Sequence, residues 1–335
     1  MPDTRTRASG IASIGGIGGI GGSSGSSGML GGIRLTGLLL AIALATSRLG
    51  LLAHELVGHG GTALACGGQI SEVQLFWFAG GWIRYHFTTP PSVAAQLAIS
   101  MGGIAVEVCA GSALWLGVRG DGLGLRLVRG IGTALVVHAS WYLATGAWQG
   151  FGDGQLLHRV LGSARYPFAF GVGAVACTCG YFGARDIVGP LRATQATLAS
   201  LVIAAGLAGG LHAGLAIGET HVRHDATYST IMQPEHDRGV DRDLARWAAY
   251  QAAHGGPTSP AQRAREHARL EQVHRTFPFA WLLGAVLAMA IAIGAWRSLR
   301  HSEPARALSD RLLVCASASA AIAIAAVIAI DQFAR

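Results

Sequence analysis

Long apolar stretches alternate with short polar connections along most of this chain. A helix that crosses the hydrocarbon core of a bilayer needs about 20 mainly apolar residues. Seven stretches meet this requirement with few charged residues, and they run approximately over 36–66, 93–117, 129–149, 166–184, 194–217, 277–296 and 312–331. The pattern therefore predicts an all-α polytopic membrane protein with about seven transmembrane helices, for which the lipid bilayer is the solvent.

The polar connections divide the chain into four segments. Residues 1–33 are predicted to be a disordered leader, because Gly and Ser leave too little apolar surface to bury. Residues 34–217 are expected to form a membrane core of five helices that carries the candidate site. Residues 218–276 are the one long polar segment and are expected to form an extramembrane helical insertion. Residues 277–335 then supply two C-terminal transmembrane helices.

The insertion carries its own helix signals. Ser259-Pro260-Ala261-Gln262 places an N-cap serine before a proline at the first helical position and a glutamine that can complete a capping box. A helix is predicted to start there, with 241–253 as its partner.

Composition narrows the class of protein further. With 51% hydrophobic and 13% charged residues, the chain does not fit a soluble domain. Its formal charge of +7 is spread over loops and not gathered in one patch, so no nucleic-acid partner is expected. All basic residues are Arg, which is typical of a GC-rich bacterial genome, and we expect a multi-pass protein of the bacterial inner membrane. Arginines flank alternate loops, which predicts a cytoplasmic N-terminus and an outside C-terminus.

The first span contains three ionisable residues, His54, Glu55 and His59. A charged side chain at mid-membrane costs about 2.5–3.5 kcal/mol on insertion scales, so such residues indicate a functional site. Neutral imidazoles bind zinc, and a nearby glutamate can take a proton from zinc-bound water. The alternative is a hydrogen-bonded polar cluster between helices that holds no metal.

The spacing of the two histidines is unusual. In the zinc-protease motif they are four residues apart and share a helix face, whereas His54 and His59 are five apart, about 140° on a regular helix. A π-bulge, which Gly58 would ease, would return both to one face. The competing geometry keeps a regular helix and pairs Glu55 with His59.

The residues around this motif carry a family resemblance. The run from His54 to Gly68, followed by 70–75 and 78–81, resembles the site-2 protease family of intramembrane zinc metalloproteases, in which a Gly-Gly turn and a short β-like membrane-edge segment follow the motif helix. The small residues in 100–107 resemble the family's packing segment, without its usual Pro and Asn. Gly152-Asp153-Gly154 is similar to its Leu-Asp-Gly signature, with Gly where the family usually has Pro.

The resemblance spans roughly 37–162 and implies a role for each site residue. His54, His59 and Asp153 would be the Zn²⁺ ligands, Glu55 the general base, and a water would fill the fourth position. The substrate would be a transmembrane or membrane-proximal protein, with an extended strand pairing along 70–87. From the residues alone, Gly-Asp-Gly is equally good chemistry for a surface turn.

Other functions stay open. A non-proteolytic transporter or ion-binding protein would use the first-span residues with His138 as a proton or metal relay. Glu107 in the second span would serve a proton pathway or orient a ligand. An inactive protease-like scaffold is the third possibility.

Overall fold

The computed structural model describes residues 24–192, 198–254, 259–300 and 308–333. These residues are mostly helical, and one two-stranded sheet lies among them. Seven helical stretches are long and apolar enough to cross a membrane, which confirms the predicted number. They run over Leu30–Ala65, Val93–Gly117, Leu123–Gln149, Gly154–Leu191, Ala199–Arg223, Phe279–Leu299 and Asp310–Phe333.

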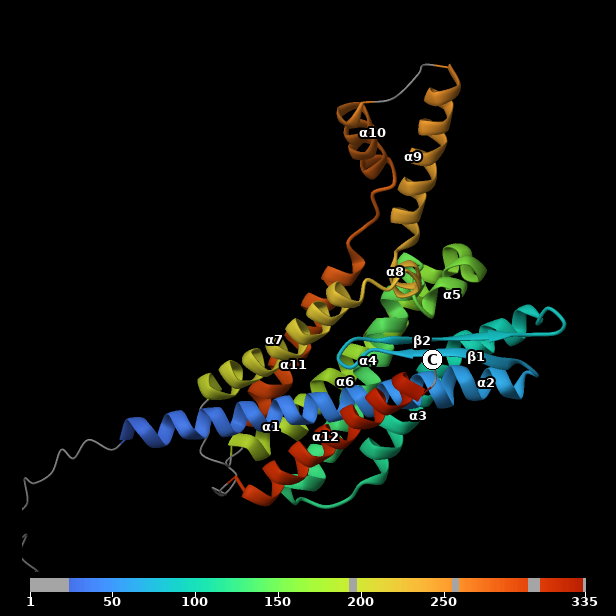
Figure 1. Cartoon of the computed structure of the whole chain (residues 1–335). Helices are drawn as coiled ribbons and strands as arrows, with labels where there is room; N and C mark the ends of the chain where they lie inside the picture. Colours follow the sequence, from blue (N-terminus) through green and yellow to red (C-terminus); the bar gives the residue numbers. More distant parts are fainter. Residues whose placement is uncertain (1–23, 193–197, 255–258, 301–307, 334–335) are drawn as a thin grey trace, which may run out of the picture.

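The first of these is a continuous rod of three parts (Figure 1). Helix α1 (Ser24–Leu52) passes into a π-helical segment, η1 (Ala53–Gly60), and then into α2 (Gly61–Ala65). Because α1 begins at Ser24, the prediction of disorder is wrong for residues 24–33, and residues 1–23 lie outside the described residues. Leu35 anchors the rod in a buried leucine cluster. The helix continues from Leu35 towards the N-terminus as far as Ser24, because each further helical residue gains one backbone hydrogen bond.

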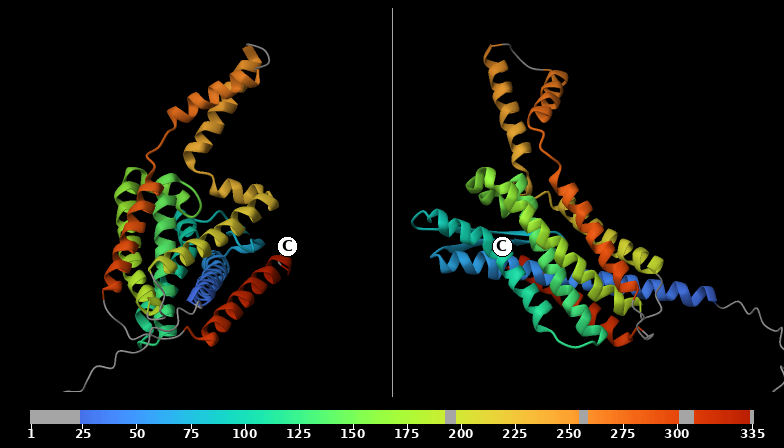
Figure 2. Two further views of the ribbon diagram at one scale, coloured as in Figure 1. Left: turned by 90° about the vertical axis from the view of Figure 1, so that its left-hand side faces the viewer. Right: turned by 180° about the vertical axis from the view of Figure 1, so that it is seen from behind.

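Four helices form a bundle on one side of the molecule. Helix α4 (Leu123–Gln149) packs along both α3 (Val93–Gly117) and α6 (Arg165–Arg192), and α6 packs along α11 (Phe279–Leu299) (Figure 2). Glycines let the backbones approach: a Cβ at Gly111 would meet the backbone of the neighbouring α4. Such small-residue contacts are typical of helix packing in membranes.

The rod packs against two further helices, α7 (Leu198–Arg223) and α12 (Asp310–Phe333). The N-terminal end of α12 is paired with α1 by an Arg34–Asp310 ion pair. Helix α7 runs to Arg223, beyond the predicted boundary at 217, because its last turn is held by a charge network. Arg223 pairs there with the buried Asp331 of α12 at 3.1 Å.

A β-hairpin follows α2 at the end of the rod, where the family resemblance implies a short β-like segment. Strand β1 (Gln69–Leu75) pairs antiparallel with β2 (Gly81–His86). The buried Arg48 donates to two carbonyls of the connecting turn 76–80, at 2.6 and 2.9 Å. Glu219 accepts three backbone N–H groups of the same turn, at 2.6–3.1 Å. These charge-assisted bonds fix the hairpin against α1 and α7.

The insertion is helical, and α9 and α10 project away from the seven long helices (Figure 1). It contains α8 (Ala226–Met232), α9 (Glu235–His254) and α10 (Pro260–Val273). The capping box predicted at Ser259 is present, and α9 contains the predicted partner helix. Helices α9 and α10 share a small core of Val240, Leu244 and Leu270.

Candidate metal centre

Three predicted ligands from distant parts of the chain meet at one point. His54 and His59 lie on η1, and Asp153 lies in the turn between α4 and α5 (Gly154–Leu161). The two Nε2 atoms are 3.1 Å apart, and they lie 2.9 and 3.1 Å from Oδ2 and Oδ1 of Asp153, respectively. The described residues thus bring together two imidazoles and a carboxylate as a group that could hold a metal ion.

The π-helix is what brings the histidines together. Its i→i+5 bonding returns residues five apart to nearly the same face, whereas a regular helix would separate them. The predicted π distortion is confirmed, and the alternative of a regular helix with Glu55 and His59 as the pair is wrong. Gly58 lies directly on α3, where a Cβ would overlap the backbone of Gly103. A Cβ at Gly103 would in turn overlap the His54 ring, so α3 packs directly against the candidate metal centre.

The outer nitrogens of both rings are occupied. Nδ1 of His59 lies 2.7 Å from the Ile99 carbonyl, which can only accept a hydrogen bond, so Nδ1 is the donor. Nδ1 of His54 lies 3.1 Å from one oxygen of the buried Glu107, and the other oxygen lies 3.0 Å from His138. Both Nδ1 atoms are therefore placed as hydrogen-bond donors, and Nε2 is the nitrogen that each ring turns towards the centre.

This arrangement fits a cation. The two Nε2 atoms face each other and the carboxylate of Asp153, and in the neutral form of both rings all of these atoms are acceptors. Oδ2 of Asp153 is buried and accepts no hydrogen bond from the described residues. Buried acceptors without a donor are costly, and a bound metal ion removes this cost by taking all of the lone pairs at once.

The spacing of the donor atoms agrees with a small tetrahedral ion. Ligand atoms at about 2.0–2.1 Å from zinc lie roughly 3.4 Å from one another. The observed 2.9–3.1 Å is within about half an ångström of that value. A carboxylate behind a histidine, as Glu107 stands behind His54, is a common arrangement that orients a metal-binding ring.

The turn that carries Asp153 is shaped by glycine. Gly150 and Gly152 have φ of +75° and +51°, and a Cβ at Gly152 would overlap the Tyr142 hydroxyl. Asp153 sits at the N-cap of α5, yet its side chain does not cap that helix and points to the histidines instead. Ser100 of α3 donates to its carbonyl at 2.7 Å, which fixes the turn against the bundle.

Glu55, the predicted base, is buried in the same π-helix with 6% of its surface exposed. It interacts electrostatically with both histidines and with Asp153. None of the described residues donates a hydrogen bond to it. Glu55 therefore lies in the same helical segment as two of the candidate ligands, without a hydrogen-bond donor among the described residues.

Sequence reasoning missed Tyr142. Its ring lies 6.4 Å from that of His54 and stacks parallel to His138 at 6.2 Å, so it forms a wall of the site. The available signal was its position four residues after His138, which places both on one face of α4.

Comparisons with known proteins do not extend this description. Neither a scan against protein-family models nor searches of curated proteins and solved structures found a match. The fold and the site define a chain with seven potential membrane-crossing helices and a His-His-Asp cluster. The resemblance to site-2 proteases rests on the residues of this chain.

Proposed function

We propose that this chain is an intramembrane zinc metalloprotease similar to the site-2 protease family. The observation that carries the proposal is the convergence of the Nε2 atoms of His54 and His59 on the carboxylate of Asp153, with both outer ring nitrogens held as donors. Two imidazoles and one carboxylate form a donor set that suits catalytic zinc and leave one coordination position for water.

The roles of the residues follow from their placement. Bound zinc would polarise a scissile carbonyl and lower the pKa of a water molecule. Glu55 accepts the proton of the attacking water and returns it to the departing amine, which balances the hydrolysis. Glu107 holds the His54 ring in orientation, and Tyr142 narrows the space beside it.

The surroundings support a protein substrate within or next to the membrane. The β-hairpin follows the motif rod directly, and β2 packs against η1. An edge strand of a hairpin can pair with an extended substrate segment. The basic residues Arg119, Arg126, Arg129 and Arg185 gather at one end of the bundle. We infer that this end is cytoplasmic in a bacterial inner membrane, and that the insertion lies outside.

Metal content tests the centre directly. Protein purified in detergent should carry about one zinc per chain, and His54→Ala and His59→Ala should each lose it. His212→Ala is the matched control. His212 lies on the membrane-crossing helix α7, and its Nε2 is 3.0 Å from Ser47 of α1 and not in the metal centre. Metal content unchanged in both cluster variants would refute the metal centre.

Cleavage is tested with a paired comparison. Wild-type and Glu55→Gln proteins are reconstituted with a membrane-protein fraction, and new peptide termini are identified by mass spectrometry. Glu55→Gln should keep the metal but produce none of the new termini. Equal termini from both proteins would remove Glu55 as the base, and zinc binding without any new termini would favour an inactive scaffold.

A second candidate is a proton or metal relay, because hydrogen-bonded groups form a chain from His59 through His54 and Glu107 to His138. The His138 side chain is 65% exposed at the end of this chain. His138→Gln separates the two functions. It should leave specific cleavage measurable in a protease, whereas in a relay it should abolish ion flux into proteoliposomes.

A further inference from the structure

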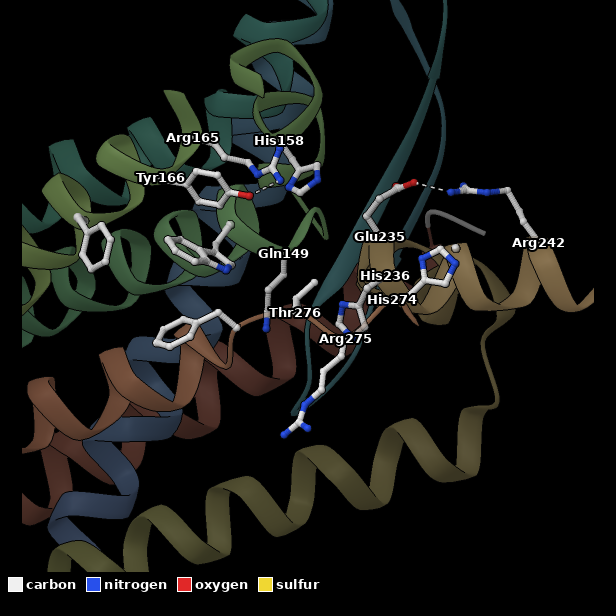
Figure 3. A pocket seen from close by; sticks show the side chains of 14 residues that line it. Gln149, His158, Arg165, Tyr166, Glu235, His236, Arg242, His274, Arg275 and Thr276 are labelled. Atoms are coloured by element: carbon white, nitrogen blue, oxygen red, sulfur yellow. Dashed lines mark hydrogen bonds and ion pairs between the residues drawn. The ribbon is translucent and has the colours of Figure 1, made fainter. Parts of the chain in front are cut away.

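A second cavity lies away from the metal centre, where the insertion meets the bundle. It has a volume of about 800 Å³ and is bounded by the end of α4, by α5 and α6, and by the start of α9. Figure 3 shows His158, Arg165 and Tyr166 on one wall, with Glu235 and Arg242 on the facing wall. Both walls carry charged side chains, and neither belongs to the metal centre.

The cavity has an excess of positive charge. Its carboxylate, Glu235, is shared by three arginines, Arg159, Arg238 and Arg242, at 3.0–3.8 Å. Burial by itself would raise the pKa of the Glu235 carboxyl. The bond from Arg242 and the neighbouring arginine charges nevertheless hold that pKa below its usual value. One negative charge thus faces three positive ones.

Two further arginines line the cavity. Arg165 donates to the Gly162 carbonyl and the Tyr166 hydroxyl, both uncharged groups. Neither Arg165 nor Arg275 forms an ion pair in the part of the chain that the structure describes. Three arginines, Arg165, Arg242 and Arg275, and one carboxylate therefore line the space, and that carboxylate is also paired with Arg159 and Arg238. This excess of positive charge favours an anion with several acceptor oxygens.

The rest of the lining is aromatic and lies at the ends of potential membrane-crossing helices. Trp148 is in the last turn of α4 and stacks on Phe279 at 4.2 Å, and Phe277 and Tyr166 lie beside it. Aromatic rings at helix ends are typical of the membrane–water boundary. An anion that occupies this cavity would have its charge against the arginines and an apolar part against these rings.

We propose that this cavity binds a phosphate-bearing anion, and that its occupant is the headgroup of an anionic phospholipid. Arginines and aromatic rings that line the same cavity fit a lipid phosphate with its glycerol and upper acyl chain better than they fit a free ion. The headgroup bridges Arg165 on the bundle and Arg242 on α9, and so fastens the insertion to the bundle.

Native mass spectrometry of the full chain in neutral detergent tests this binding. Wild-type protein should retain phosphatidylglycerol in preference to phosphatidylcholine. The double variant Arg165→Gln/Arg242→Gln should lower that retention about 30-fold, since each arginine near an anionic lipid contributes roughly a factor of five. The matched control Arg263→Gln/Arg265→Gln removes the same charge from exposed positions on α10 and should bind like wild type.

Hydrogen exchange on the wild-type chain gives a second measurement of lipid binding that does not depend on how the variants fold. Nanodiscs that contain phosphatidylglycerol should protect amides in residues 235–242 relative to phosphatidylcholine alone. Equal protection by inorganic phosphate without anionic lipid would support the phosphate site but assign it a soluble ligand. Equal lipid retention by the double variant and wild type, or no protection by either ligand, would overturn the proposal.

Discussion

Deleting Val57 should leave the metal centre intact, although it removes a residue from the middle of the motif. The π-helix holds one more residue per turn than a regular helix would. Without Val57, His54 and His59 become four residues apart. On a regular helix that spacing separates them by about 40°, so both still face Asp153. The flanking helices keep their register, because the deletion removes the bulge and not a regular position.

The expected cost is small. The Val57 side chain is 61% exposed, and full burial of a valine contributes only about 1.5–3 kcal/mol, so the deletion loses about 1 kcal/mol or less. Even if this whole loss fell on metal binding, the zinc affinity would stay within about fivefold of wild type, which corresponds to about 1 kcal/mol. Deleting Leu49, which is 53% exposed in regular α1, is the matched control. That deletion turns one part of the rod by about 100° against the other and should abolish zinc binding.

The assay is a chelator competition that gives the zinc dissociation constant of each purified variant, with circular dichroism to show that the helices are retained. If the Val57 deletion lost zinc as completely as the Leu49 deletion, the histidines would not depend on the π-helix for their convergence. The geometric account of the site would then be wrong.

Three further predictions concern the packing, the orientation and the pH response. Gly103→Ala should weaken zinc binding by roughly 5- to 150-fold, since overpacking costs about 1–3 kcal/mol. Gly117→Ala on the same helix places its methyl group in open space and should leave zinc binding unchanged. Chelator competition measures the zinc dissociation constants of both variants. Glu107→Gln should cost about 10–100-fold in zinc affinity with the fold retained, and an unchanged dissociation constant would exclude its orienting role. The hydrogen bond from His274 lowers the pKa of the partly exposed Asp243 carboxyl. The α9–α10 pair should therefore be stabilised above the unfolded pKa of about 3.9 and lose this contribution as the pH falls through the lower folded value. Hydrogen exchange of 235–273 from pH 6 to pH 2 measures it, and Asp243→Asn should show no such step.

The sequence predicted the local features of this fold well. The seven apolar stretches correspond to seven long helices. Their length is predictable, because the rise of a helix per residue and the thickness of a bilayer together require about 20 apolar residues. The capping box at Ser259 starts α10 through contacts only three residues apart. The five-residue spacing of His54 and His59 required a distorted helix if both were to reach one ion, and the π-helix provides it.

The sequence could not show which distant groups complete the site. The proton on His59 is placed by the Ile99 carbonyl, 40 residues away, and Tyr142 joins the site only because α4 packs against α3. The basic cavity exists because α9 returns to the end of the bundle, which brings Arg242 opposite Arg165.

Apolar stretches, capping and residue spacing depend on contacts within a few residues of the chain. They were enough to predict where the helices lie, that the charged motif falls within an apolar helix, and that this helix needs a bulge. The partners of that motif are fixed by packing between helices that are far apart in sequence. The tertiary structure alone therefore decided that the Nε2 atoms of the two histidines face Asp153, because each Nδ1 is held by a group on another helix.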